Sequence, residues 1–203
     1  MNEYAFHPAA ERNKTPILDV FRAVVPADAN VLEIGSGGGQ HAKHFCNEMP
    51  GLRWQPTEVG DAVGSLQLGL SGSCQNILPA IAIDVKDACW PVGKFDAIYT
   101  SNTLHIMSWE HVTAFFPGVG RHLCAGGVAV IYGPFIYDGQ HTADSNRAFD
   151  LELRRKAPQM GIRDVAELEM LAQSAGLFLR DDFEMPVNNR VLVFERTGSG
   201  END

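Results

Sequence analysis

A cluster of glycines follows a short apolar run in the stretch "VLEIGSGGGQHAKHF". Gly35 and Gly37 allow a sharp turn and let a ligand touch the backbone, because glycine has no Cβ and accepts positive φ. The helical pattern that resumes at about Gly39 offers unpaired N–H groups at its start. With Glu33 directly before the turn, the stretch predicts a ligand-binding strand–turn–helix unit.

Three further residues narrow the class of ligand. Gln40 stands where the third glycine of G-x-G-x-x-G would close the packing around a dinucleotide pyrophosphate, which weakens a dinucleotide interpretation. Glu58 follows Glu33 by 25 positions, about where a carboxylate accepts from both hydroxyls of a ribose. Asp84 ends the next apolar run, "AIDV", where it could accept from an adenine amine. Each acid alone is equally compatible with a solvated strand end, but together they favour adenosine with a cationic end over NAD.

Several motifs resemble those of a known superfamily. The stretches "VLEIGSGGGQ", "AIDV", "FDAIYTSNTLHI" and "LCAGGVAVIYGPF", with the acid Glu58, resemble the successive motifs of class I S-adenosylmethionine (SAM) dependent methyltransferases. More narrowly, "HPAAERNKTPIL", "WQPTE", "HTADSN", "GIRD" and "EMPVNN" resemble a family of small methyltransferase-like proteins whose substrate is unassigned. Relatives often have Asp in place of Glu58, and the ribose role survives that change.

The resemblance implies SAM as cofactor, S-adenosylhomocysteine as product, and a role for each matching position. The methionine moiety of SAM would lie against Gly35, Ser36 and Gly37, and Glu33 would help to hold its amino group. The other expected cofactor contacts are Glu58 on the ribose, Asp84 and Val85 on the adenine, and Ser101 and Asn102 beside the sulfonium.

Methyl transfer from a sulfonium is an in-line displacement that needs alignment rather than an enzyme nucleophile. An amine or hydroxyl acceptor would need a base, and His105 and His141 are the candidates, with Tyr132 and Asp144 as lesser ones. Each histidine has an alternative interpretation as a structural or surface residue.

The segment from 132 to 146, "YGPFIYDGQHTADSN", is expected to be a substrate-side loop or lid, or else a connector packed on the sheet edge. Arg12 and Asn13 could fold over the same pocket, and Asn146 is the third candidate for substrate binding. Arg12 could equally pair with a surface carboxylate.

These residues need a scaffold, and the apolar pattern predicts an α/β one. Short strands at 30–34, 52–57, 80–84, 95–101 and 127–132 alternate with helices, which indicates a parallel sheet covered on both faces. A helix should begin at Thr15 as N-cap with Pro16 at its first position, and another at Asp164, ending at Gly176. The last two runs, joined by "PVNN", should pair as an antiparallel hairpin. The resemblance implies a Rossmann-like, seven-stranded, mostly parallel sheet with an antiparallel last strand beside the sixth.

Size and composition set outer limits. The 203 residues suit one domain, expected over 1–196, with a disordered polar tail at 197–203. A net charge of −9 makes a nucleic-acid partner unlikely, and no apolar run is long enough for a membrane span, so we expect a cytosolic protein. His41 and His44 share a helix face, but no third ligand clusters with them and the four cysteines are scattered, so no metal site is expected.

The leading hypothesis is therefore a SAM-dependent methyltransferase acting on a small molecule. An NAD(P)-dependent oxidoreductase and a non-catalytic SAM-binding protein are the alternatives. The sequence indicates neither the acceptor nor an oligomeric state.

Overall fold

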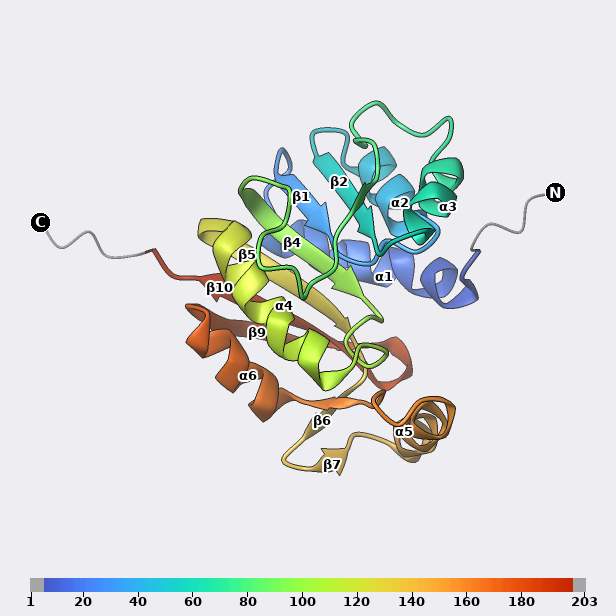
Figure 1. Ribbon diagram of the computed structural model, residues 1–203, viewed down its shortest axis with the longest axis vertical. Coiled ribbons are helices and arrows are strands. Elements are labelled where there is room, and N and C mark those ends of the chain that lie inside the picture. Colours follow the sequence, from blue (N-terminus) through green and yellow to red (C-terminus); the bar gives the residue numbers. More distant parts are fainter. Residues whose placement is uncertain (1–5, 199–203) are drawn as a thin grey trace, which may run out of the picture.

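A seven-stranded sheet forms the centre of the computed structural model, which describes residues 6–198 (Figure 1). Its strand order is β3-β2-β1-β4-β5-β10-β9, with β10 antiparallel to both of its neighbours. The strands are β1 (Asn30–Glu33), β2 (Arg53–Glu58), β3 (Ile81–Ala82), β4 (Phe95–Ser101), β5 (Leu123–Gly133), β9 (Leu177–Met185) and β10 (Asn189–Arg196). The expected mostly parallel sheet and its antiparallel last strand are confirmed. Most of the expected tail, residues 199–203, lies outside the described residues.

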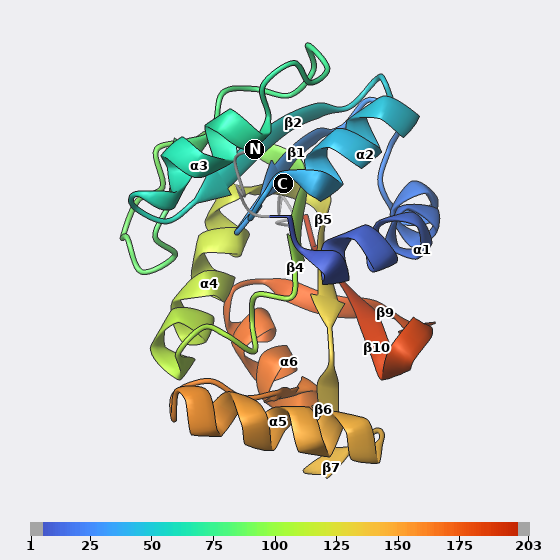
Figure 2. The same cartoon turned by 90° about the vertical axis from the view of Figure 1, so that its right-hand side faces the viewer.

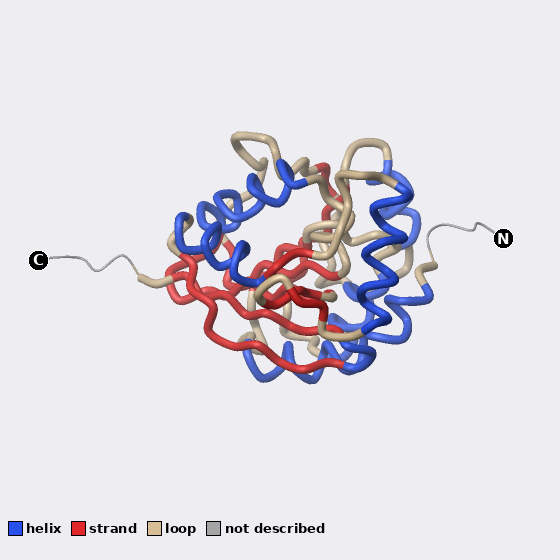
Figure 3. Tube along the Cα trace, turned by 90° about the horizontal axis from the view of Figure 1, so that it is seen from below, coloured by secondary structure: helices blue, strands red, loops and turns tan. Residues whose placement is uncertain are grey.

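Helices cover both faces of this twisted sheet (Figures 2 and 3). One face carries α1 (Pro8–Val24) and α2 (Gln40–Glu48), and the other carries α4 (Trp109–His122) and α6 (Val165–Ser174). The remaining helices are α3 (Ala62–Gly69), α5 (Asp144–Lys156) and the 3-10 turn η1 (Pro186–Asn188). None of the helices in residues 6–198 is both long and apolar enough to span a bilayer.

The side chains of the central strands alternate between two separate apolar layers, one on each face of the sheet. In β5, Val128 and Val130 join the layer beneath α1 and α2, whereas Ala129 and Ile131 join the layer beneath α4 and α6. Successive residues of a strand point to opposite faces, so a strand covered on both sides must be apolar at every position. This explains the unbroken run "VAVIY" in the sequence.

The first helix differs from the sequence prediction. It begins at Pro8, with His7 at the N-cap position, and continues past Thr15 with Pro16 in its interior. The predicted N-cap at Thr15 is therefore wrong, because Pro8 already fills the first-turn position where the missing proline N–H costs nothing. The other predicted N-cap is confirmed, since the Asp164 side chain accepts from the backbone N–H of Ala166.

The segment from 132 to 146 folds back on itself instead of forming an open loop. It builds β6 (Phe135–Tyr137) and β7 (Gln140–His141), and β6 pairs with β7 on one side and with β8 (Arg163–Asp164) on the other in a small second sheet. This sheet lies beside α5 at one end of the molecule (Figure 2). The expected lid is thus an ordered connector, which matches the alternative interpretation of this segment.

Candidate functional site

A cavity of about 660 Å³ opens at the carboxyl ends of the first strands of the main sheet. Nine of the predicted site residues line it: Gly35, Ser36, Gly37, Glu58, Asp84, Val85, Ser101, Asn102 and His105. Ligands of open α/β sheets collect at this edge, where the strand order changes direction. The fold therefore brings together, in one cavity, predicted site residues that are far apart in the chain.

The floor of the cavity is the glycine turn between β1 and α2. Gly35, Gly37 and Gly39 all have positive φ, at 71°, 55° and 73°. A Cβ on Gly35 would come within 2.8 Å of the Thr103 methyl carbon. The turn is also bonded to β2, because the Ser36 N–H donates to the Thr57 carbonyl at 2.8 Å. Side chains are excluded here, so a ligand can approach the main chain closely.

Glu58 is held in place at the end of β2. One of its carboxylate oxygens accepts from the Gly37 N–H at 3.0 Å and the other accepts from the Val59 N–H at 2.9 Å. A carboxylate has about four acceptor sites, so two remain for a ligand. The glycine turn and the acid therefore form one pre-organised hydrogen-bonding unit.

Asp84 lines the cavity beyond β3, next to the start of α4. Its carboxylate accepts from the Lys86 N–H at 2.9 Å and lies 3.7 Å from His111 Nε2. The other nitrogen of His111 contacts the hydroxyl of Ser108, the N-cap residue of α4, at 2.6 Å. His111 was not predicted from the sequence, and it reaches the cavity through the fold of the α4 N-terminus.

Glu33 lies behind the cavity wall and is only 1% exposed. Its carboxylate accepts from the Trp54 indole N–H at 2.9 Å. Burial raises the pKa of Glu33 to about 7, and the nearby Glu58 acts in the same direction, against the hydrogen bonds from Trp54 and Ser36. Glu33 is not among the lining residues, so any contact with a ligand would have to pass through an intermediate group.

The end of β4 adds a second special backbone position. Asn102 has a φ of 58°, and its N–H donates to the Tyr132 carbonyl at 2.9 Å. The Ser101 hydroxyl before it is buried beside the equally buried hydroxyl of Tyr99.

His105 is buried in the loop after β4, with its ring 5.4 Å from that of Phe149 on α5. Burial lowers its pKa to about 4, and the neighbouring Arg163 guanidinium adds to the effect. The ring is therefore neutral at neutral pH and can accept a proton from a bound group. His105 was predicted as the first candidate base, and its position in the cavity fits that prediction.

The loop that carries His105 is fixed by the segment before α6. The Arg163 side chain donates to the carbonyls of Leu104, Met107 and Gln159, and the Gly161 N–H donates to the His105 carbonyl at 2.9 Å. Arg163 is buried, and this burial lowers the pKa of its guanidinium. Backbone carbonyls, and not a carboxylate, accept the hydrogen bonds of the Arg163 guanidinium. The geometry of the loop that carries His105 therefore depends on the Arg163 side chain.

The N-terminal segment closes the other side of the cavity, as expected, but with His7, Ala9 and Ala10 in the lining instead of Arg12 and Asn13. The His7 N–H donates to the Gln40 side-chain oxygen at 2.6 Å, and the Gln40 amide donates back to the His7 carbonyl at 3.3 Å. His41 Nε2 donates to Asn13 Oδ1 at 2.8 Å, and burial lowers the His41 pKa to about 4. The Gln40 side chain thus holds the N-terminal segment beside the glycine turn by two hydrogen bonds to the His7 backbone.

The remaining predicted site residues do not line this cavity: Arg12, Asn13, Tyr132, His141 and Asn146. His141 Nε2 is 3.8 Å from the Asp150 carboxylate, and the Asn146 amide donates to the Thr142 hydroxyl and the Asn188 carbonyl, both at 2.9 Å. Burial raises the pKa of Tyr132. His141 and Asn146 lie at α5 because the segment after β5 folds away from the cavity mouth. Asn13 is bonded to His41 under α1, and Arg12 is exposed on α1.

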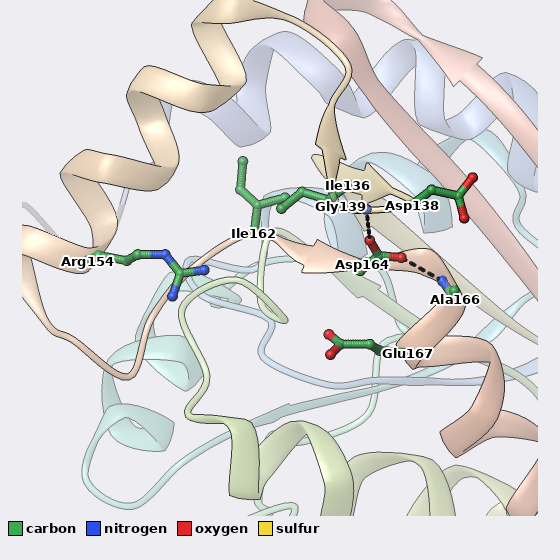
Figure 4. A pocket seen from close by; sticks show the side chains of 8 residues that line it. All are labelled: Ile136, Asp138, Gly139, Arg154, Ile162, Asp164, Ala166 and Glu167. Atoms are coloured by element: carbon green, nitrogen blue, oxygen red, sulfur yellow. Dashed lines mark hydrogen bonds between the residues drawn. The ribbon is translucent and has the colours of Figure 1, made fainter.

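A second hollow of about 430 Å³ lies between β6, α5 and α6 (Figure 4). Asp164 is prominent in it, but both of its oxygens already accept backbone N–H groups, from Gly139 at 2.7 Å and Ala166 at 2.9 Å. Arg154 on its other wall is paired with Asp150. Asp164 and Arg154 therefore serve the local fold.

Several solved structures with the same fold are named as methyltransferases. The chain aligns with human N-acetylserotonin methyltransferase in complex with SAM at 15% identity and a TM-score of 0.78, over 94% of this chain and 53% of that one. It aligns with CalO1, a methyltransferase in calicheamicin biosynthesis bound to SAH, at 20% identity and 0.73, over 92% and 54%. An O-methyltransferase family protein from Burkholderia thailandensis gives 15% and 0.79, over 94% and 58%.

This chain spans between half and three fifths of the length of those three proteins. The likeness shows the class I SAM-dependent methyltransferase fold that the sequence motifs indicated. A family model also matches the chain over residues 4–196, nearly from end to end. The chain belongs to the family described as protein of unknown function (DUF938).

Proposed function

We propose that this chain is a SAM-dependent methyltransferase, one domain over residues 1–196, that methylates a small molecule. The observation that carries the proposal is the single cavity in which the Gly35–Gly37 turn, Glu58 and Asp84 meet His105. A carboxylate, a glycine turn and a second acid suit the ribose, the methionine moiety and the adenine of SAM. When bound there, SAM supplies an electrophilic methyl group.

The residues present fit such a ligand. Glu58 is already oriented by two backbone N–H groups, and its free acceptor sites would take the two ribose hydroxyls. Asp84 and the backbone of Val85 would take the adenine, and Ser101 and Asn102, which line the cavity at the end of β4, would border the sulfonium. Glu33, being buried behind the turn, would act on the amino group through a bridging group.

His105 is the residue that we assign to proton transfer. It is buried, neutral and in the cavity, and its loop is held by Arg163 and Gly161. His141 and Tyr132 lie outside the cavity lining, so the proposal gives them no catalytic role.

An NAD(P)-dependent oxidoreductase is less well supported. The place of the third dinucleotide glycine holds Gln40, whose side chain is occupied with the N-terminal segment at His7 and Glu11. In addition, β10 lies antiparallel between β5 and β9, which departs from the parallel dinucleotide fold.

Isothermal titration with SAM, S-adenosylhomocysteine and NADH tests the proposal. We expect both adenosine–methionine ligands to bind and NADH to bind at least tenfold more weakly. The absence of SAM and S-adenosylhomocysteine binding at millimolar ligand would refute the proposal. Binding without methyl transfer to any component of a cell extract would support the non-catalytic alternative instead.

A further inference from the structure

The acceptor side of the cavity has a distinct chemical character, and it carries an inference that rests on the proposed function. We infer that the methyl acceptor is an uncharged, largely apolar small molecule that presents a hydroxyl group. Three properties of the lining residues support this inference: their charge, the state of their histidines and the apolar side chains at the mouth.

The charge of the lining residues disfavours an anionic acceptor. Glu58 and Asp84 are carboxylates, and no Lys or Arg lines the cavity within residues 6–198. A bound SAM molecule contributes a net charge of +1, which offsets only one of the two carboxylates, so the occupied cavity keeps a net negative charge. A carboxylate or phosphate on the acceptor would be repelled at low effective dielectric and would find no cation to pair with.

The state of the histidines disfavours an alkylamine. An ammonium group must lose a proton before its nitrogen can attack, and its ordinary pKa is near that of lysine, about 10.4. Burial keeps the two buried imidazoles of the cavity, His41 and His105, neutral, with pKa values of about 4. They are too weak as bases to deprotonate an ammonium group, and His41 already donates to Asn13. The other two lining histidines lie beside groups assigned to the cofactor, His7 at Gly37 and His111 at Asp84.

A hydroxyl acceptor fits this neutral imidazole. Its oxygen would attack the methyl carbon while the carbon–sulfur bond breaks and leaves its electron pair on sulfur, giving S-adenosylhomocysteine. The hydroxyl proton would pass to the His105 ring as the new carbon–oxygen bond forms, giving a methyl ether. An oxygen that becomes positive during this step is far more acidic than an imidazolium, so the transfer is favourable.

Large apolar side chains at the mouth indicate an apolar body on the acceptor. Phe149 and Ile106 line the cavity and are 37% and 49% exposed, and the Phe149 ring contacts that of His105. Ala10 of α1 adds apolar surface to the lining. Exposed apolar side chains gathered at one part of a cavity are typical of a site for the apolar part of a ligand.

Three naphthalene probes separate the charge classes: 2-naphthol, the anion 6-hydroxy-2-naphthoate and the cation 1-naphthylmethylammonium. Binding to the full chain saturated with S-adenosylhomocysteine is measured by calorimetry at pH 7.5. We expect 2-naphthol to bind at least tenfold more tightly than the anion. The lining carboxylates attract the cation, so that probe is tested by methyl transfer: with SAM in place of S-adenosylhomocysteine, we expect 2-naphthol to be methylated and 1-naphthylmethylammonium to stay unmethylated at pH 7.5. Tighter binding of the anion, methylation of the ammonium probe, or no binding of 2-naphthol at millimolar concentration would overturn the inference.

Variants of α5 locate the probe. Phe149→Ala should weaken 2-naphthol binding by about tenfold, whereas Leu151→Ala, which removes a 52% exposed side chain outside the cavity lining, should leave it unchanged. Phe149→Arg should shift the preference toward 6-hydroxy-2-naphthoate, because it supplies the missing cation. Equal effects of the two alanine variants would refute the assignment of this wall.

S-adenosylhomocysteine binding is measured separately for every variant, so that a wrong acceptor class can be distinguished from a wrong proposed function. If the cofactor product binds and the 2-naphthol result fails, the acceptor class is wrong and the proposed function stands. If the cofactor product itself does not bind to the wild type, both are refuted.

Discussion

Replacing Glu58 with alanine is expected to weaken SAM binding by about a hundredfold. Two ribose hydrogen bonds to a charged acceptor are worth roughly 1.5–3 kcal/mol each. The lower value applies because Glu58 is partly exposed and its oxygens are shared with the N–H groups of Gly37 and Val59. The expected loss is therefore about 3 kcal/mol, or about two orders of magnitude in Kd.

The assay is isothermal titration of SAM and S-adenosylhomocysteine, with two controls. Glu58→Gln keeps one oxygen acceptor and should lose about half of the binding free energy that alanine loses. His105→Ala should change affinity much less, because His105 faces the acceptor. Circular dichroism during heating checks that each variant is folded. Comparable affinity of the wild type and Glu58→Ala would show that the ribose has been placed wrongly.

Other perturbations test the site in different ways. Because the folded pKa of Glu33 is about 7, above the ordinary value of 4.5, the folded state binds the extra proton and stability should fall as pH rises from 4.5 to 7. Relative to Glu33→Gln, this loss should reach about 3 kcal/mol by pH 8, seen in urea unfolding, and parallel pH profiles would contradict it. Arg163→Met should raise the His105 pKa above about 4, measured by NMR titration of the ring. An unchanged midpoint would refute the electrostatic effect of Arg163 on His105. Gly35→Ala, at φ 71°, should destabilise the chain by about 1–3 kcal/mol and weaken SAM binding, whereas Gly64→Ala in α3 has open space and should stabilise it by up to about 1 kcal/mol; similar unfolding temperatures would contradict this.

The cofactor side of the cavity was predictable because its residues are fixed by their place along the chain. Gly35 and Asp84 follow β1 and β3, Glu58 is the last residue of β2, and the carboxyl ends of parallel strands share one edge of a sheet. Strand pattern alone therefore brings them together. The antiparallel hairpin was predictable for the same kind of reason, since "PVNN" is too short for a crossover helix.

The acceptor side depends on tertiary packing and was predicted less well. His7 reaches the cavity because Gln40 bonds the N-terminal segment, and Phe149 reaches it from a mostly polar helix. Neither contact has a local sequence signal. His141 was predicted in the site but lies beside Asp150, because β7 pairs with β6 in the small second sheet instead of extending over the mouth.

Transfer of a radiolabelled methyl group from SAM into a cell extract, fractionated by size, tests the central claim most directly. We predict that the wild-type chain labels material of low molecular mass and that Glu58→Ala, at a SAM concentration well below its own Kd, labels far less. Absence of label from every fraction, at a concentration where SAM binding is demonstrated, would contradict the assignment of this chain as a methyltransferase.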